Sequence, residues 1–251
     1  SLLAFLFLFL AWTYRQIIFF SIVPGILAIV FILLIKDVDP VKIDESYSKY
    51  HGKKRVDKID RNFIKLIIIL GVIEFASLDI SFLILRASDY TGPELIFLIP
   101  LLYLLSNIVY MVMSPITGTL SDKIGRKPVI VAGLSVLLVT CIVLAFPVDV
   151  SAIALVIIFV LYIMYGYYMA SVDPISRAYV ADLAGKDKRG RAYGLYYFSV
   201  GLISLGESVL FGLIYDVFSF TVAFIYVSVL LLVCIIIFVV TDFSRILKDE
   251  S

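Results

Sequence analysis

Long apolar runs, separated by short polar segments, occupy most of this chain. A helix rises about 1.5 Å per residue, so roughly 18–20 apolar residues suffice to cross a hydrocarbon core about 30 Å thick. On this basis we predict transmembrane helices over the ranges 17–35, 64–86, 95–116, 128–147, 152–173, 192–214 and 221–240. The pattern therefore predicts an all-α integral membrane protein.

Residues 1–11 form a shorter apolar stretch, below the roughly 17 residues that a spanning helix needs. The stretch has no basic region in front of it and no small-residue cleavage site before Trp12. We therefore favour a truncated helix over a signal peptide. The first residue is Ser1 rather than Met, which agrees with an N-terminal end that is cut short.

Composition and charge add an orientation. Hydrophobic residues make up 62% of the chain, and the mean hydropathy is +1.08, whereas soluble domains are roughly 45–50% apolar. If residues 36–63 are cytoplasmic, all but two of the 21 Lys and Arg residues lie on that side, the exceptions being Arg15 and Arg86. By the positive-inside rule, we expect a multi-pass protein of the cell membrane with a cytoplasmic C-terminus.

The longest polar segment, residues 36–63, divides the chain into a first block, 1–35, and a second block, 64–251. We interpret this segment as a cytoplasmic central loop. Its basic stretch 47–55 is either solvated or held against the anionic inner leaflet, and we favour the solvated loop because neighbouring acids dilute its positive charge.

A charged segment bracketed by glycines lies between two predicted spans: Gly118-Thr119-Leu120-Ser121-Asp122-Lys123-Ile124-Gly125-Arg126-Lys127. It resembles the signature loop of the major facilitator superfamily, which joins two transmembrane helices on the cytoplasmic side. A second stretch similar to this family, 177–195, occupies the position of another cytoplasmic loop and includes Arg177, Asp182, Arg189 and Gly190. A third, from Ser77 to Ala87, is similar to a branch of prokaryotic facilitators.

The resemblance implies a twelve-helix secondary transporter in which each half consists of two inverted three-helix repeats. The six spans after the central loop would form the carboxy-terminal half, and residues 1–35 would be the end of the preceding half. Such a protein lies in the lipid bilayer and binds a small-molecule substrate near the midplane between its halves. The missing amino-terminal half of the same chain is therefore an expected partner.

The resemblance also implies a role for Asp122 in gating. It would reach the positive N-terminal end of a helix in the other half, where a carboxylate is stabilised by up to about 2 kcal/mol. Gly118 and Gly125 would allow close backbone approach. The alternative is that the loop only fixes topology through its bases, Lys123, Arg126 and Lys127. This alternative leaves Asp122 and the glycines unexplained.

Three acidic side chains lie well inside predicted spans, where acids are rare because an ionised group at a helix centre costs about 2.5–3.5 kcal/mol. Glu74 shares a helical face with Ser77 and Ser81, at spacings of three and seven, and we expect this face to line a cavity. Asp79 points about 140° away from Glu74, so we expect the two not to share one site. Asp79 would form either an interhelical hydrogen bond or part of an outer gate.

Glu207 is the third acid inside a span, at a position where the family pattern often has a Gly-Pro pair instead of Gly206-Glu207. Burial in a medium of low dielectric constant favours a neutral carboxyl group, so Glu207 is a candidate for loading and releasing a proton. The alternative is a permanently protonated side chain that forms a hydrogen bond across helices.

Two predicted spans carry polar and aromatic side chains at helical spacing. In 95–116 they form one stripe that is a candidate for solute binding: Tyr103, Asn107, Tyr110 and Ser114. In 152–173, Tyr162, Tyr165 and Met169 repeat the theme, and for these we favour packing.

Several enzyme classes lack their residues in this chain. The only histidine is His51, in the polar loop, so haem bis-histidine, zinc-protease and Ser-His protease sites are unsupported. The run 201–208 copies the spacing of a phosphate-binding loop, but Glu207 stands where that loop needs a lysine. We expect no enzymatic activity, no cofactor, no metal and no nucleic-acid partner.

The expected function is export of a small amphipathic or drug-like molecule in exchange for protons, because the candidate cavity residues include aromatic and acidic side chains but no basic one. Proton-coupled uptake of a sugar or other polar metabolite is the alternative, and it calls for more amide and hydroxyl groups. A non-transporting membrane sensor or scaffold with the same fold is a third possibility.

Overall fold

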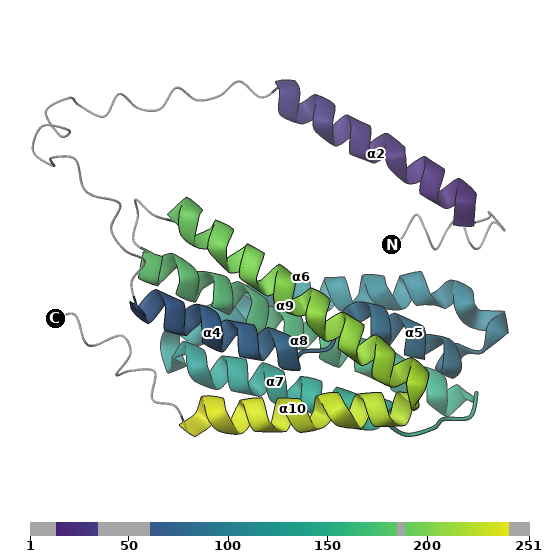
Figure 1. Ribbon diagram of the computed structural model, residues 1–251. Coiled ribbons are helices and arrows are strands. Elements are labelled where there is room, and N and C mark those ends of the chain that lie inside the picture. Colours follow the sequence, from purple (N-terminus) through teal and green to yellow (C-terminus); the bar gives the residue numbers. More distant parts are fainter. Residues whose placement is uncertain (1–13, 35–60, 185–188, 241–251) are drawn as a thin grey trace, which may run out of the picture. The chain divides into compact units, whose positions relative to one another are not determined.

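The computed structural model describes residues 14–34, 61–184 and 189–240 (Figure 1). The chain divides into two units, one of which holds α2 (Tyr14–Leu34). This helix covers residues 17–34 of the predicted span 17–35 and contains Pro24. The predictions for residues 1–11, for residues 36–60 of the central loop and for residues 241–251 lie outside the described residues, whereas residues 61–63 of the predicted loop are helical.

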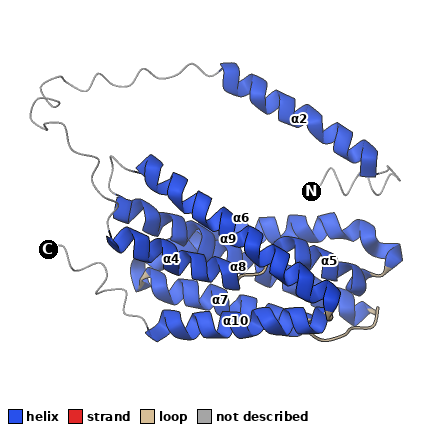
Figure 2. Ribbon diagram, viewed as in Figure 1, coloured by secondary structure: helices blue, strands red, loops and turns tan. Residues whose placement is uncertain are grey.

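The other unit is a bundle of helices, and the described residues contain no β-strand (Figure 2). Its elements follow in this order: α4 (Arg61–Ala76), α5 (Ile80–Thr91), the 3-10 helix η1 (Pro93–Leu98), α6 (Ile99–Ile124), α7 (Arg126–Leu144), α8 (Ala152–Ala184), α9 (Arg189–Val217) and α10 (Phe220–Val240). Together they supply six helical segments that are long and apolar enough to cross a membrane. The predictions of an all-α membrane protein and of six spans after residue 63 are confirmed.

The predicted ends of several spans are wrong, and the differences are largest for α6 and α8. α6 continues past residue 116 to Ile124, and α8 continues past residue 173 to Ala184. Hydropathy marks the part of a helix that meets lipid, whereas backbone hydrogen bonding continues through polar residues until a residue interrupts it. At Gly125 the interruption is a backbone φ of +94°, which residues other than glycine rarely adopt.

Most of the two segments predicted as loops is therefore helical. Residues 118–124 form the last turns of α6, so the signature segment is reduced to a sharp turn at Gly125 between α6 and α7. Arg177 and Asp182 lie on the last turns of α8, and α9 starts at Arg189 and Gly190. The family-like sequence is thus carried mainly by helix ends.

The predicted span 64–86 is broken rather than continuous. α4 ends at Ala76 and α5 starts at Ile80. Asp79 adopts an extended backbone and accepts a hydrogen bond of 2.7 Å from the backbone N of Ser81, so it is the N-cap of α5. A capping aspartate inside an apolar run starts a new helix, which explains the break that hydropathy does not detect.

Close packing of α8 against its neighbours depends on two glycines. A Cβ at Gly166 of α8 would lie 2.5 Å from the backbone O of Ser106 on α6, and a Cβ at Gly133 of α7 would lie 2.7 Å from Ser171 Cβ on α8. These helices approach closely because glycine presents no side chain at the crossing. Fully buried apolar side chains on α6, α7, α8 and α9 belong to the core of the bundle, among them Leu102, Ile130, Leu134, Leu137, Ile158 and Phe211.

Two helices bury only a small part of their surface within the bundle. In the most apolar windows of the α6 and α9 spans, 11% of the residues are buried, against 39–44% for the other four spans. Cβ atoms placed at Gly194 or Gly201 of α9 would meet nothing within 4 Å. α6 and α9 therefore present an open face in the described part of the chain.

A carboxyl-rich cavity as candidate functional site

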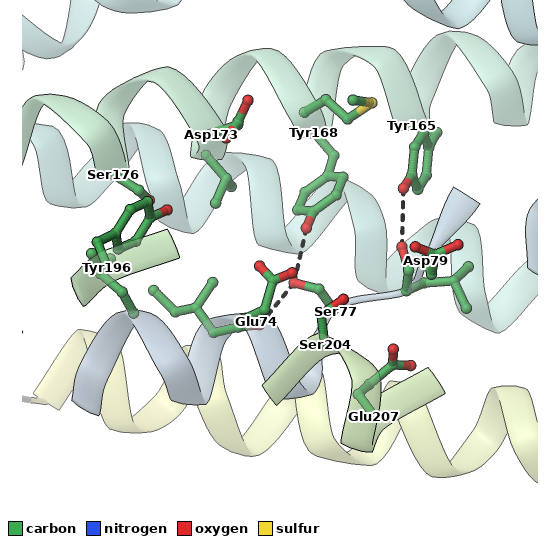
Figure 3. A pocket seen from close by; sticks show the side chains of 15 residues that line it. Glu74, Ser77, Asp79, Tyr165, Tyr168, Asp173, Ser176, Tyr196, Ser204 and Glu207 are labelled. Atoms are coloured by element: carbon green, nitrogen blue, oxygen red, sulfur yellow. Dashed lines mark hydrogen bonds between the residues drawn. The ribbon is translucent and has the colours of Figure 1, made fainter. Parts of the chain in front are cut away.

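A cavity of about 300 Å³ lies inside the six-helix bundle (Figure 3). Its walls come from α4, the break after it, α8 and α9. The lining residues are Leu70, Ile73, Glu74, Ser77, Leu78, Asp79, Tyr165, Tyr168, Met169, Val172, Asp173, Ser176, Tyr196, Ser204 and Glu207. Four of them carry carboxyl groups, and none of them is Lys, Arg or His.

The break between α4 and α5 brings Glu74 and Asp79 to the same cavity. The expectation that they could not share one site is therefore wrong, because the rotation of 100° per residue on which it rested applies only to a continuous helix. For the same reason Ser81, at the start of α5, does not share the face of Glu74 and Ser77. Ser81 is exposed and lies outside the cavity lining.

Two tyrosines of α8 hold the break in place. The Tyr168 hydroxyl donates a hydrogen bond of 2.8 Å to Ser77 Oγ, and the Tyr165 hydroxyl donates one of 3.0 Å to the backbone O of Leu78. Ser77 Oγ in turn donates to the backbone O of Ile73 at 2.7 Å. Groups that the interrupted helix leaves without a backbone partner are thus satisfied by side chains. Tyr165, which the sequence suggested as a packing residue, serves both the cavity wall and the break.

Glu207 reaches the cavity from α9 and is only 4% exposed. Its Oε2 accepts a hydrogen bond of 3.2 Å from Ser208 Oγ. Its Oε1 has no hydrogen-bond partner among the described residues. A buried carboxyl oxygen without a partner is costly, so this atom is a point of the cavity where a hydrogen-bond donor would be favoured.

Asp173 is a cavity residue that the sequence analysis missed. Its Oδ2 accepts hydrogen bonds from Arg177 Nη2 at 2.7 Å and from the Tyr110 hydroxyl at 3.2 Å. Arg177 Nη2 also donates to the Tyr110 hydroxyl at 2.8 Å. Asp173 stood at the last position of the predicted span 152–173, where an acid is unremarkable. Its spacing of four residues from Arg177 was the signal that could have found it.

The stripe predicted on 95–116 is only partly connected to the cavity. Tyr110 touches Asp173 and Arg177 but does not line the cavity, and neither do Tyr103 and Asn107. Asn107 Nδ2 donates to the backbone O of Tyr103 at 2.8 Å, within α6. Tyr103 is 37% exposed, on a helix that belongs to the open face of the bundle.

Around Gly125 the two family-like stretches are in direct contact. Arg126 forms an ion pair with Asp182, and its guanidinium lies over the ring of Tyr179, 4.7 Å from the centroid. Lys127 Nζ donates a hydrogen bond of 2.6 Å to the backbone O of Val239, near the C-terminal end of α10, where a positive charge is favoured. The two basic residues that follow Gly125 therefore join α7 to α8 and α10.

Gly118 and Asp122 behave differently. A Cβ at Gly118 would meet nothing within 4 Å, so no close backbone approach occurs there among the described residues. Asp122 is exposed, and the structure records no ion pair for it among the described residues. Its predicted role in gating stays a prediction.

The donor set of the cavity limits its chemistry. Among the described residues, no group of three or more His, Cys, Asp or Glu side chains could hold a metal ion. The cavity instead combines carboxyl groups, hydroxyl groups, aromatic rings and aliphatic side chains, a set suited to binding a small solute and a proton.

Comparisons with known proteins agree with the fold. The sequence model of the Major Facilitator Superfamily matches residues 67–248. An MFS-type transporter of Methanocaldococcus jannaschii is 32% identical over 231 residues, which cover 90% of this chain and 55% of that protein. The chain thus spans about half the length of this relative.

Proposed function

Because the chain belongs to the Major Facilitator Superfamily, we propose that it moves a small molecule across the membrane by alternating access, in exchange for protons. The family indicates a transporter rather than an enzyme. Six membrane-spanning segments make it a multi-pass membrane protein. We propose the cell membrane as its location, with the C-terminus in the cytoplasm as the distribution of Lys and Arg predicts.

The open face of the bundle supports a partner for this chain. α6 and α9 are the least buried spans, and the glycines Gly194 and Gly201 on α9 leave room for a close helix contact. We propose that an amino-terminal half of the transporter packs against these two helices. The cavity would then lie beside the interface between the halves, where such transporters bind substrate.

The observation that carries the proposed function is that Glu74 and Glu207 line one cavity, although each lies in the apolar interior of a span. Ionised groups at this depth are expensive and face protein or water rather than lipid. A carboxyl group that takes up a proton in one conformation and releases it in the other couples proton movement to solute movement. We propose Glu207 as the principal proton site, because it is only 4% exposed, whereas Glu74 is partly exposed.

Transport by the whole protein tests this proposal. We expect inverted membrane vesicles to accumulate an exported solute when a proton gradient is imposed, and Glu207→Gln to abolish the dependence on the gradient. Glu94→Gln, an exposed position in η1 outside the cavity, is the matched control and should transport like the wild type. Full gradient-driven accumulation by Glu207→Gln would remove Glu207 from the coupling role.

A second candidate function is proton-coupled uptake of a polar metabolite. The cavity holds more hydroxyl groups than the sequence analysis anticipated: Ser77, Tyr165, Tyr168, Ser176, Tyr196 and Ser204. However, Ser77, Tyr165 and Tyr168 use theirs to hold the helix break. Accumulation of a sugar in right-side-out vesicles, with no accumulation of amphipathic solutes in inverted ones, would favour uptake.

A further inference from the structure

The four carboxyl groups of the cavity fall into two pairs. Asp79 is occupied as the N-cap of α5, where its Oδ1 accepts a hydrogen bond of 2.7 Å from Ser81 N. Asp173 is occupied by Arg177, at 2.7 Å, and by Tyr110. For Glu74 and Glu207, the structure records no ion pair within the described residues. These two carboxyl groups are therefore the ones available to a solute.

Glu207 has a carboxyl oxygen that is not satisfied by a hydrogen bond from the described residues. The side chain is 4% exposed and lines the cavity, and its Oε1 has no hydrogen-bond partner in the described part of the chain. Figure 3 shows its carboxyl group directed toward the other labelled cavity residues. A solute with a hydrogen-bond donor at this point would satisfy an atom that is otherwise buried without a partner.

The rest of the cavity specifies the charge and shape of that solute. None of the lining residues is basic, and Arg177, which contacts the lining residue Asp173, is already paired with it, so a negatively charged solute would meet carboxyl groups and no basic side chain among the lining residues. Tyr165, Tyr168 and Tyr196 supply aromatic rings, which attract cations over their faces. Leu70, Ile73 and Val172 supply an apolar wall.

We infer that the cavity binds an organic ammonium ion, a positively charged N–H group carried on an apolar body, and that Glu207 Oε1 accepts a hydrogen bond from this group. Glu74 supplies a second negative charge to the same site. The inference rests on the proposed function, since it names the class of solute that the transporter moves. An ammonium ion and a proton are then alternative occupants of Glu207.

Binding to the whole transporter in detergent, measured by isothermal titration calorimetry without any gradient, tests the inference. The probes are 4-phenylbutylammonium, its N,N,N-trimethyl derivative, which keeps the charge but has no N–H donor, and 5-phenylpentanoate, which reverses the charge. We expect the ammonium ion to bind about tenfold or more tightly than the trimethyl derivative, and 5-phenylpentanoate to bind weakest. Equal binding of 5-phenylpentanoate and the ammonium ion would overturn the inference.

Variants locate the site. Glu207→Gln should weaken binding of 4-phenylbutylammonium by about tenfold or more, because a charge-assisted hydrogen bond becomes a neutral one. Glu94→Gln, outside the cavity, should leave binding unchanged. If Glu207→Gln binds the ammonium ion as tightly as the wild type, the assignment of Glu207 is wrong. The comparison of probes on the wild-type protein still decides the charge preference if a variant fails to fold.

This binding experiment separates the inference from the proposed function. Tight binding of the ammonium ion without proton-driven flux would contradict proton-coupled transport and leave the inference standing. Proton-driven transport of neutral solutes, with no binding of the ammonium ion, would support the proposed function and overturn the inference.

Discussion

The hydroxyl group of Tyr168 donates a hydrogen bond of 2.8 Å to Ser77 Oγ, across the gap between α8 and the end of the broken span. Tyr165, one turn earlier on α8, does the same for the backbone O of Leu78. The break that shapes the cavity is therefore held by a neighbouring helix, and its stability depends on two phenolic groups.

Removing these hydroxyl groups should destabilise the protein. We expect Tyr168→Phe and Tyr165→Phe each to lower the free energy of unfolding by about 1 kcal/mol, because each leaves a buried group with one partner fewer. Tyr162→Phe is the matched control on the same helix. Its hydroxyl is buried without a hydrogen-bond partner among the described residues, so its removal should be neutral or stabilising. Thermal unfolding in detergent measures all three, and a loss for Tyr162→Phe equal to that for Tyr168→Phe would contradict the assignment.

Substitution of Arg86 should destabilise the protein more than substitution of most other basic residues. It is 2% exposed and donates to the backbone O of Leu144 at 3.2 Å and of Phe146 at 2.7 Å, while its guanidinium lies 3.7 Å from the centroid of the Phe220 ring. It thereby joins α5 to the end of α7 and the start of α10.

We expect Arg86→Met to cost about 2 kcal/mol or more, since two carbonyl oxygens lose a charged donor. Arg191→Met, at an exposed position of α9, should change stability by less than about 0.5 kcal/mol. Chemical unfolding in detergent gives both values. A cost for Arg86→Met no greater than that for the control would show that these contacts do not support the fold.

The crossing of α6 and α8 should tolerate no side chain at Gly166. A Cβ there would lie 2.5 Å from a backbone oxygen, so Gly166→Ala forces the helices apart, and we expect a loss of about 1–3 kcal/mol. Gly212→Ala is the matched control, since its Cβ would lie at an ordinary 3.9 Å from Phe82. The shift in melting temperature measures both, and a neutral Gly166→Ala would mean that the crossing is looser than described.

The ion pair between Arg126 and Asp182 should be weak and sensitive to salt. The Asp182 side chain is 61% exposed, so water screens the interaction. We expect a double-mutant cycle with Arg126→Ala and Asp182→Ala to give a coupling energy of about 0.2–1 kcal/mol. The coupling should fall as the salt concentration rises. A coupling that is larger and independent of salt would indicate that the pair becomes buried when the whole transporter is assembled.

The role predicted for Asp122 is tested by Asp122→Asn. A cysteine introduced at Ser176, in the cavity, can be labelled by a membrane-impermeant thiol reagent. If the Asp122 carboxylate locks one side of the transporter, Asp122→Asn should increase this labelling. Lys123→Gln in the same turn is the control for a general change in charge. Unchanged transport and unchanged labelling for Asp122→Asn would refute the gating role of Asp122.

The sequence allowed the spans to be recognised but not their ends. Apolar runs located the six candidate spans that the structure describes after residue 63, because lipid requires a continuous apolar surface of fixed length. The same signal ended α8 at residue 173, whereas the helix continues through Asp173 and Arg177 to Ala184. Outside the hydrocarbon core, polar side chains leave the helix intact, and hydropathy has no information about where it stops.

By itself, the sequence determined the fold class, the spacing of the helices along the chain and the candidates Glu74 and Glu207, because apolar runs and acids within them follow from local composition. Only the tertiary structure decided that Asp79 and Asp173 join these two acids in one cavity, while Ser81, Tyr103 and Asn107 stay outside its lining. The physical reason is that the capping interaction of Asp79 breaks a helix and changes which side chains face inward. The closeness of α8 to α6 and α7 likewise depends on glycines whose neighbours are far away in the chain.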